Sequence, residues 1–315
     1  MGLRVIEYRQ LTFILTMFLI VQFSGILLAS IDLRGVTTQQ IASAQIATTP
    51  ISALFLIAYI VILSAVMIFL FRVYKGNAIF KIIEGAVIFI ASFFVFFTLL
   101  GNLNLNFGLV AAVILAIALV IAKNRYQKLK NLTAMIASVG VGLVLGLSFS
   151  FLDALIFMAI LAAYDFIAVF VTKHMLTLAN VAIENNLALL IDVKEVEAVP
   201  ESYLSKGERT AFEKEKASIE KNARPLRGVI EKGMVPMAAN VSLGTGDLAM
   251  PLMVAISAFG VSMNFTLSIF VTLGAALGLI LTMFILRRFK RALPAIPPLL
   301  FGVLIGVGVY YLLAL

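Results

Sequence analysis

The chain has 315 residues, of which 62% are hydrophobic and only 13% are charged. Soluble globular proteins are about 45–50% apolar and about 25% charged, so this composition, with a mean hydropathy of +1.10, excludes a soluble enzyme, a disordered protein and a nucleic-acid-binding protein. The remaining class is an integral, multi-pass protein of the cell membrane. In that class a net charge of +8 first indicates how basic residues are distributed among the loops.

The residue types available for chemistry are restricted. The chain has no cysteine, which excludes disulfides, thiolate nucleophiles and cysteine-bound metals, and its one histidine, His174, cannot form a His-Glu-x-x-His zinc site. We therefore expect no metal and no organic cofactor. Catalysis would have to come from carboxylates, hydroxyls or backbone groups.

Nine apolar segments have about the 20 residues that an α-helix needs to cross a hydrocarbon core. They are residues 11–30, 51–71, 79–100, 107–122, 132–150, 152–173, 236–258, 265–286 and 294–314. The first resembles a signal peptide because Arg4 and Arg9 precede it, but its apolar run exceeds the usual core of about 7–15 residues. The sequence therefore predicts an all-α integral membrane protein with nine transmembrane helices.

Basic residues predict the orientation of these helices, because cytoplasmic loops are enriched in lysine and arginine. With the N-terminus in the cytoplasm, 23 of the 24 basic residues lie on the cytoplasmic side and only Arg34 lies outside. Removing or shifting one span would scatter this pattern. We therefore expect a cytoplasmic N-terminus and an extracytoplasmic C-terminus.

One long polar segment, residues 185–233, has nine basic and nine acidic residues. Balanced charge with few apolar residues favours a flexible cytoplasmic loop over a packed domain. It divides the chain into a six-helix N-terminal bundle, residues 1–184, and a three-helix C-terminal bundle, residues 234–315.

Two acidic residues fall well inside predicted helices, where a charge is costly and usually functional. Asp165 precedes Lys173, at the cytoplasmic end of the sixth span, by eight residues, which places it about 12 Å deep. Asp247 follows Pro236, the expected first turn of the seventh span, by eleven residues, which places it about 16 Å deep. The six-helix bundle thus carries one of these acids and the three-helix bundle carries the other, at similar depths.

Two carboxyl groups at one level of a bundle can share a proton and titrate as a pair. In an aspartic protease the ionised partner takes a proton from water while the protonated partner polarises the scissile carbonyl. The same pair could instead carry protons or cations through a channel or transporter, or could only hold two helices together.

The residues that flank these acids favour an open, irregular site. Asp247 ends the run Gly244-Thr245-Gly246-Asp247, in which the glycines allow close backbone approach. Asp165 follows Tyr164, whose hydroxyl could donate a hydrogen bond. The ninth span opens with several prolines, which disfavour regular helix; it reads Pro294-Ala295-Ile296-Pro297-Pro298.

These three sites, in this order, resemble the presenilin and signal peptide peptidase family of intramembrane aspartyl proteases, most closely its archaeal members. That family is marked by Tyr-Asp in its sixth helix, Gly-x-Gly-Asp in its seventh and Pro-Ala-Leu at the start of its ninth. The match covers nearly the whole chain, but Ile296 stands where the family has leucine, which leaves its role in substrate docking open.

The resemblance implies a presenilin-like fold and a catalytic dyad. Asp165 and Asp247 would be catalytic, while Tyr164 and the residues 244–246 and 294–296 would support the site or bind substrate. The partners implied are the lipid bilayer and single-pass transmembrane or signal-peptide-like substrates, with no nucleic acid. A homo-oligomer is compatible with the sequence.

Overall fold

The computed structural model describes residues 2–33, 77–101, 105–126, 129–171, 190–200, 234–289 and 294–314. The chain divides into two compact units: one is residues 1–14 with 192–242, and the other is residues 15–191 with 243–315. The larger unit contains most of the membrane helices and every predicted site residue. Helices from both sides of the polar segment therefore belong to one compact body, while the predicted division into two bundles and a loop stays a prediction.

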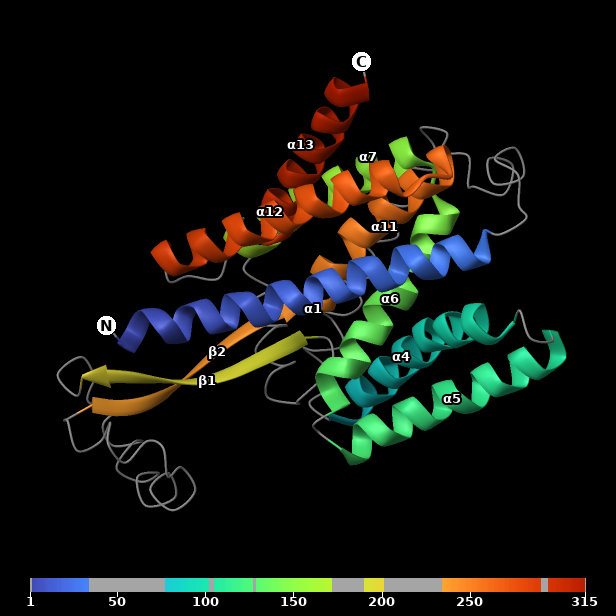
Figure 1. The fold of residues 1–315 in the computed structure, drawn as a ribbon. Coiled ribbons are helices and arrows are strands. Elements are labelled where there is room, and N and C mark those ends of the chain that lie inside the picture. Colours follow the sequence, from blue (N-terminus) through green and yellow to red (C-terminus); the bar gives the residue numbers. More distant parts are fainter. Residues whose placement is uncertain are drawn as a thin grey trace. The chain divides into compact units, whose positions relative to one another are not determined.

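Eight helices and two strands are described (Figure 1). The helices are α1 (Gly2–Asp32), α4 (Asn77–Leu100), α5 (Leu105–Arg125), α6 (Lys130–Ser148), α7 (Phe151–Phe166), α11 (Thr245–Ser262), α12 (Phe265–Phe289) and α13 (Ile296–Ala314). A short π-helix, η2 (Ile167–Val171), continues α7, and the strands are β1 (Leu190–Pro200) and β2 (Met234–Gly244).

Within the described part of the chain, eight helices are long and apolar enough to cross a membrane. They correspond to eight of the nine predicted spans, and the ninth, residues 51–71, lies outside the described residues. Many Leu, Ile, Val and Phe side chains on these helices are exposed, which suits contact with lipid. The protein is a helical, multi-pass integral membrane protein.

The predicted start of the seventh helix, at residue 236, is wrong. Residues 234–244 form strand β2, which pairs with β1, and α11 begins only at Thr245. An apolar run alone does not distinguish a strand from a buried helix, and Pro236 cannot donate to a helical ladder unless it lies in the first turn. Asp247 therefore lies in the first turn of α11, so its depth cannot be calculated by helical rise from Pro236.

The described membrane-spanning segments are all helical, as expected, and the two-stranded sheet is an addition that the sequence did not predict. Its strand β1 lies within residues 185–233, the polar segment expected to be a loop. Strand pairing joins two segments that are far apart in sequence, so the composition of either segment alone does not predict it.

Helix α11 forms the centre of the larger unit. It packs against α6, α7, α12 and α13, and nearly all its residues from Asp247 to Gly260 are buried. Two glycines of α6 permit this approach, because a Cβ at Gly142 would lie 2.7 Å from Leu252 Cδ2 and one at Gly146 would lie 2.6 Å from Ile256 Cβ. The first turn of α11, which carries Asp247, is therefore part of a closely packed element.

Helices α12 and α13 are in direct backbone contact. Their glycines face one another: a Cβ at Gly302 would lie 2.1 Å from the Gly274 carbonyl oxygen, and one at Gly278 would lie 2.4 Å from the Pro298 carbonyl oxygen. Small residues at such crossings let helices in membranes pack by van der Waals contact. This contact fixes the beginning of α13, where the Pro-Ala-Ile run lies.

Candidate active site

Asp247 is held by the residues that begin its own helix. Gly244 is the N-cap of α11, with extended backbone, and its N–H donates to Asp247 Oδ2 at 3.2 Å. An acidic side chain in a first helical turn is also stabilised by the helix dipole. A Cβ at Gly244 would lie 3.0 Å from the same oxygen, so glycine leaves this carboxyl the space it occupies.

Asp165 lies at the end of α7, directly before the π-helical turn, and its side chain is only 2% exposed. Its Oδ2 accepts a hydrogen bond from the backbone N–H of Ile296 at 3.3 Å, and the backbone of Ala295 also interacts with this carboxyl. Its Oδ1 is buried without a hydrogen-bond partner. That oxygen therefore keeps an unused capacity to accept or, if protonated, to donate a hydrogen bond.

The donor from α13 follows from the order of residues at its start. The first N–H groups of a helix have no partner within the helix, and prolines have no N–H to offer. Ile296 is followed by Pro297 and Pro298, and the N–H of Leu299 bonds to the Ala295 carbonyl. The N–H of Ile296 thus remains to bind a partner outside the helix.

The structure brings the three predicted motifs together. Helices α7, α11 and α13 pack against one another, and the carboxyl groups of Asp165 and Asp247 are close enough to interact electrostatically. The carboxyl of Asp247, in the first turn of α11, and that of Asp165, at the end of α7 beside the start of α13, are both buried, and such a pair can share a proton and activate water.

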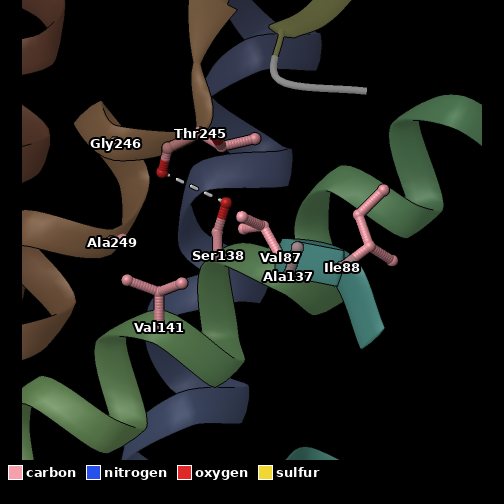
Figure 2. A pocket seen from close by; sticks show the side chains of 8 residues that line it. All are labelled: Val87, Ile88, Ala137, Ser138, Val141, Thr245, Gly246 and Ala249. Atoms are coloured by element: carbon pink, nitrogen blue, oxygen red, sulfur yellow. Dashed lines mark hydrogen bonds between the residues drawn. The ribbon is translucent and has the colours of Figure 1, made fainter. Parts of the chain in front are cut away.

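A cavity of about 110 Å³ adjoins the turn that carries Asp247 (Figure 2). It is mostly apolar and is lined by Val87, Ile88, Ala137, Ser138, Val141, Thr245, Gly246 and Ala249. A Cβ added at Gly246 would meet nothing within 4 Å, so the backbone here borders open space. The glycine expected to allow close approach is therefore accessible beside the catalytic candidate.

The remaining predicted residues lie beside the pair. Tyr164 is partly buried and directly precedes Asp165, and Pro294 is buried ahead of α13. Their roles stay predictions. Within the described residues, no group of three His, Cys, Asp or Glu side chains is placed to hold a metal ion.

Sequence analysis missed two polar residues near the site. Gln22 of α1 donates to the Leu248 carbonyl, and Ser138 of α6 donates to the Thr245 carbonyl. Both lie inside apolar spans, and an uncharged polar residue at such a position is a weak signal that could have marked them. Their partners could not have been inferred, because each contact joins distant parts of the chain.

Comparison with known proteins identifies related chains. Residues 15–314 match the family model described as "Signal-peptide peptidase, presenilin aspartyl protease". Two solved structures titled as a presenilin family intramembrane aspartate protease, in the C222 and P2 space groups, are similar in fold. Each is 20% identical; the first has a TM-score of 0.58 and covers 96% of this chain and 98% of its own, and the second has 0.59, 95% and 96%. No curated protein matches the sequence.

Proposed function

Because the chain belongs to the signal-peptide peptidase and presenilin family of aspartyl proteases, we propose that Asp165 and Asp247 are its catalytic dyad. The protein is an intramembrane aspartic endopeptidase, and the dyad would hydrolyse peptide bonds of transmembrane-helix substrates within the bilayer. The observation that carries this proposal is the Ile296 N–H that donates to Asp165, since it joins the first and third motifs around a buried carboxyl.

The chemistry requires one ionised and one protonated carboxyl. The ionised carboxylate removes a proton from water as the water oxygen attacks the scissile carbonyl carbon, and the protonated carboxyl donates to the carbonyl oxygen. Collapse of the tetrahedral intermediate breaks the C–N bond, with a proton passed to the leaving nitrogen. The unpartnered Oδ1 of Asp165 is suited to contact the water or the substrate carbonyl.

The substrates we propose are single-pass transmembrane or signal-peptide-like helices. A helical peptide bond is shielded by its own ladder, so the substrate must unwind near the dyad before a carboxyl can reach it. Gly246 borders the open space beside Asp247, and it leaves room for an extended substrate backbone. Tyr164, Gly244, Thr245 and the residues 294–296 would support this site.

We also propose the full topology indicated by the basic residues. The chain would cross the membrane nine times, with its N-terminus in the cytoplasm and its C-terminus outside. Residues 185–233 would then be cytoplasmic and connect the spans that carry the two aspartates.

The proposal is tested by cleavage of a single-pass substrate helix co-reconstituted in liposomes, with products identified by mass spectrometry. Asp165→Ala and Asp247→Ala should each abolish cleavage while the purified protein remains folded. Asp153→Asn is the matched control, because Asp153 lies at the opposite end of α7, where its backbone N–H bonds to Ser150 Oγ.

Full cleavage by either alanine variant would contradict the dyad. Carboxylate-dependent ion flux across the same liposomes, without any peptide product, would instead favour a channel or transporter.

A further inference from the structure

Gln22 is a polar residue buried in an apolar helix. Its side chain is 0% exposed in the span Leu11–Asp32, and its Nε2 donates to the backbone carbonyl of Leu248 at 3.0 Å. The other amide atom, Oε1, is buried with no hydrogen-bond partner. An unpaired buried acceptor costs free energy, so Gln22 is a poor choice for stability alone.

Ser138 makes a second contact to the same turn from a different helix. Its side chain is 1% exposed, and its Oγ lies 3.2 Å from the Thr245 carbonyl oxygen (Figure 2). The same hydroxyl lies 2.8 Å from the Ala134 carbonyl within α6, so its one hydrogen is shared between the two carbonyls and the bond to Thr245 is the weaker. Two helices, α1 and α6, thus reach carbonyls on either side of Asp247.

This turn lacks part of its own support. It is the first turn of α11, where helices fray, and it follows directly on strand β2. In a regular helix the Asp247 carbonyl would accept from residue 251, but that residue is Pro251 and has no N–H. The external donors to the Thr245 and Leu248 carbonyls therefore add restraint on both sides of the one carbonyl, that of Asp247, which lacks its ladder bond.

We propose that Gln22 and Ser138 are positioning residues, which orient the Asp247 carboxyl by fixing the Leu248 and Thr245 carbonyls. This inference rests on the proposed function, since it assigns Asp247 a catalytic role. Neither residue touches the reacting atoms. They act through the backbone on both sides of the aspartate, and displacement of a catalytic group by about 1 Å can cost about 100-fold in rate.

A purely structural role predicts a different result from a positioning role. Gln22→Met keeps the length of the side chain and removes both the donor and the unpartnered acceptor. Leu248 lies within α11, where the N–H of residue 252 can donate to its carbonyl, so Gln22→Met leaves no buried polar group without a partner and should cost little stability. A positioning residue should therefore lose turnover without losing stability, whereas a residue that only joins helices should lose stability first.

The test compares four variants of the full-length protein in liposomes. Gln22→Met and Ser138→Ala remove the two donors, Asp247→Ala is the inactive reference, and Ser257→Ala is the matched control. Ser257 is also buried on α11, but its Oγ donates to the Val254 carbonyl of its own helix at 2.9 Å, away from the Asp247 turn. The kcat and KM for one transmembrane substrate and the melting temperature are measured for each.

We expect kcat to fall about tenfold or more in Gln22→Met and several-fold in Ser138→Ala, with KM changed by less than about twofold. The melting temperature of Gln22→Met should equal or exceed that of the unmodified protein, and Ser257→Ala should keep its kcat. If Gln22→Met cannot be recovered as a folded protein, the kcat and melting temperature of Ser138→Ala decide between a positioning role and a structural role.

The failures are distinguishable. Unchanged kcat in Gln22→Met and Ser138→Ala, with Asp247→Ala inactive, would overturn this inference alone, as would a fall in kcat matched by a fall in melting temperature. An active Asp247→Ala variant would overturn the proposed function and this inference together.

Discussion

Asp165 and Asp247 are held in different ways, although both are buried carboxylates. Asp247 accepts from Gly244, three residues earlier at the start of the same helix, whereas Asp165 accepts from Ile296, 131 residues later in another helix. Local sequence therefore holds the Asp247 carboxyl, and helix packing holds the Asp165 carboxyl. The geometry of Asp165 depends on the position of α13.

The Ile296 N–H bond gives a prediction at the scale of a single residue. Ile296→Pro removes this N–H from Asp165, while proline is favoured at the first position of a helix and should leave α13 intact. A hydrogen bond to a charged group is worth about 1.5–3 kcal/mol, so we expect cleavage to slow by at least about tenfold. Single-turnover cleavage in liposomes measures this effect.

Ile296→Leu is the comparison, since leucine keeps the backbone N–H and restores the family residue. It should lose much less activity than Ile296→Pro. Equal activity of the two variants would show that the hydrogen bond from residue 296 to Asp165 does not contribute to cleavage.

At the scale of the helices, the contact between α12 and α13 positions the start of α13. Gly274 and Gly302 bring the two backbones together at a distance that no larger residue permits. Since α13 begins with the residues that contact Asp165, the helix pair connects membrane packing to the site.

Gly302→Ala should disturb both stability and activity. Its Cβ would lie 2.1 Å from the Gly274 carbonyl oxygen, so the helices must separate, and overpacking of this kind costs about 1–3 kcal/mol. The melting temperature in detergent and the rate of substrate cleavage should both fall. Gly308→Ala, on the same helix but with nothing within 4 Å of its Cβ, should change neither.

If Gly302→Ala lowered the melting temperature while the cleavage rate per folded molecule stayed constant, the position of α13 would not control the site. That result would confine the glycine contact to stability.

For the whole molecule, the distribution of basic residues predicts an odd number of crossings. With 23 of the 24 lysines and arginines assigned to the cytoplasmic side, the termini would lie on opposite faces of the membrane. Reporter domains fused to each end should therefore differ in accessibility, with the N-terminal one cytoplasmic. Labelling of both termini from the same face would require an even number of spans.

The sequence predicted most of the described membrane helices and their boundaries, but not the start of α11. Eight predicted spans coincide with membrane-length helices, because a segment's preference for lipid depends on its own composition. The predicted start of this helix was residue 236, whereas α11 begins at Thr245. The sequence did not show this because β1 and β2 pair across distant segments of the chain. The ninth predicted span, residues 51–71, falls outside the described residues.

Composition and motif order by themselves determined that this is a multi-pass membrane protein with two candidate aspartates, because burial in lipid and the rarity of charge there are local properties. Only the tertiary structure determined which groups reach those aspartates. Ile296, Gln22 and Ser138 each form hydrogen bonds across more than 100 residues. Such contacts depend on how whole helices pack, and no local pattern in the chain encodes that packing.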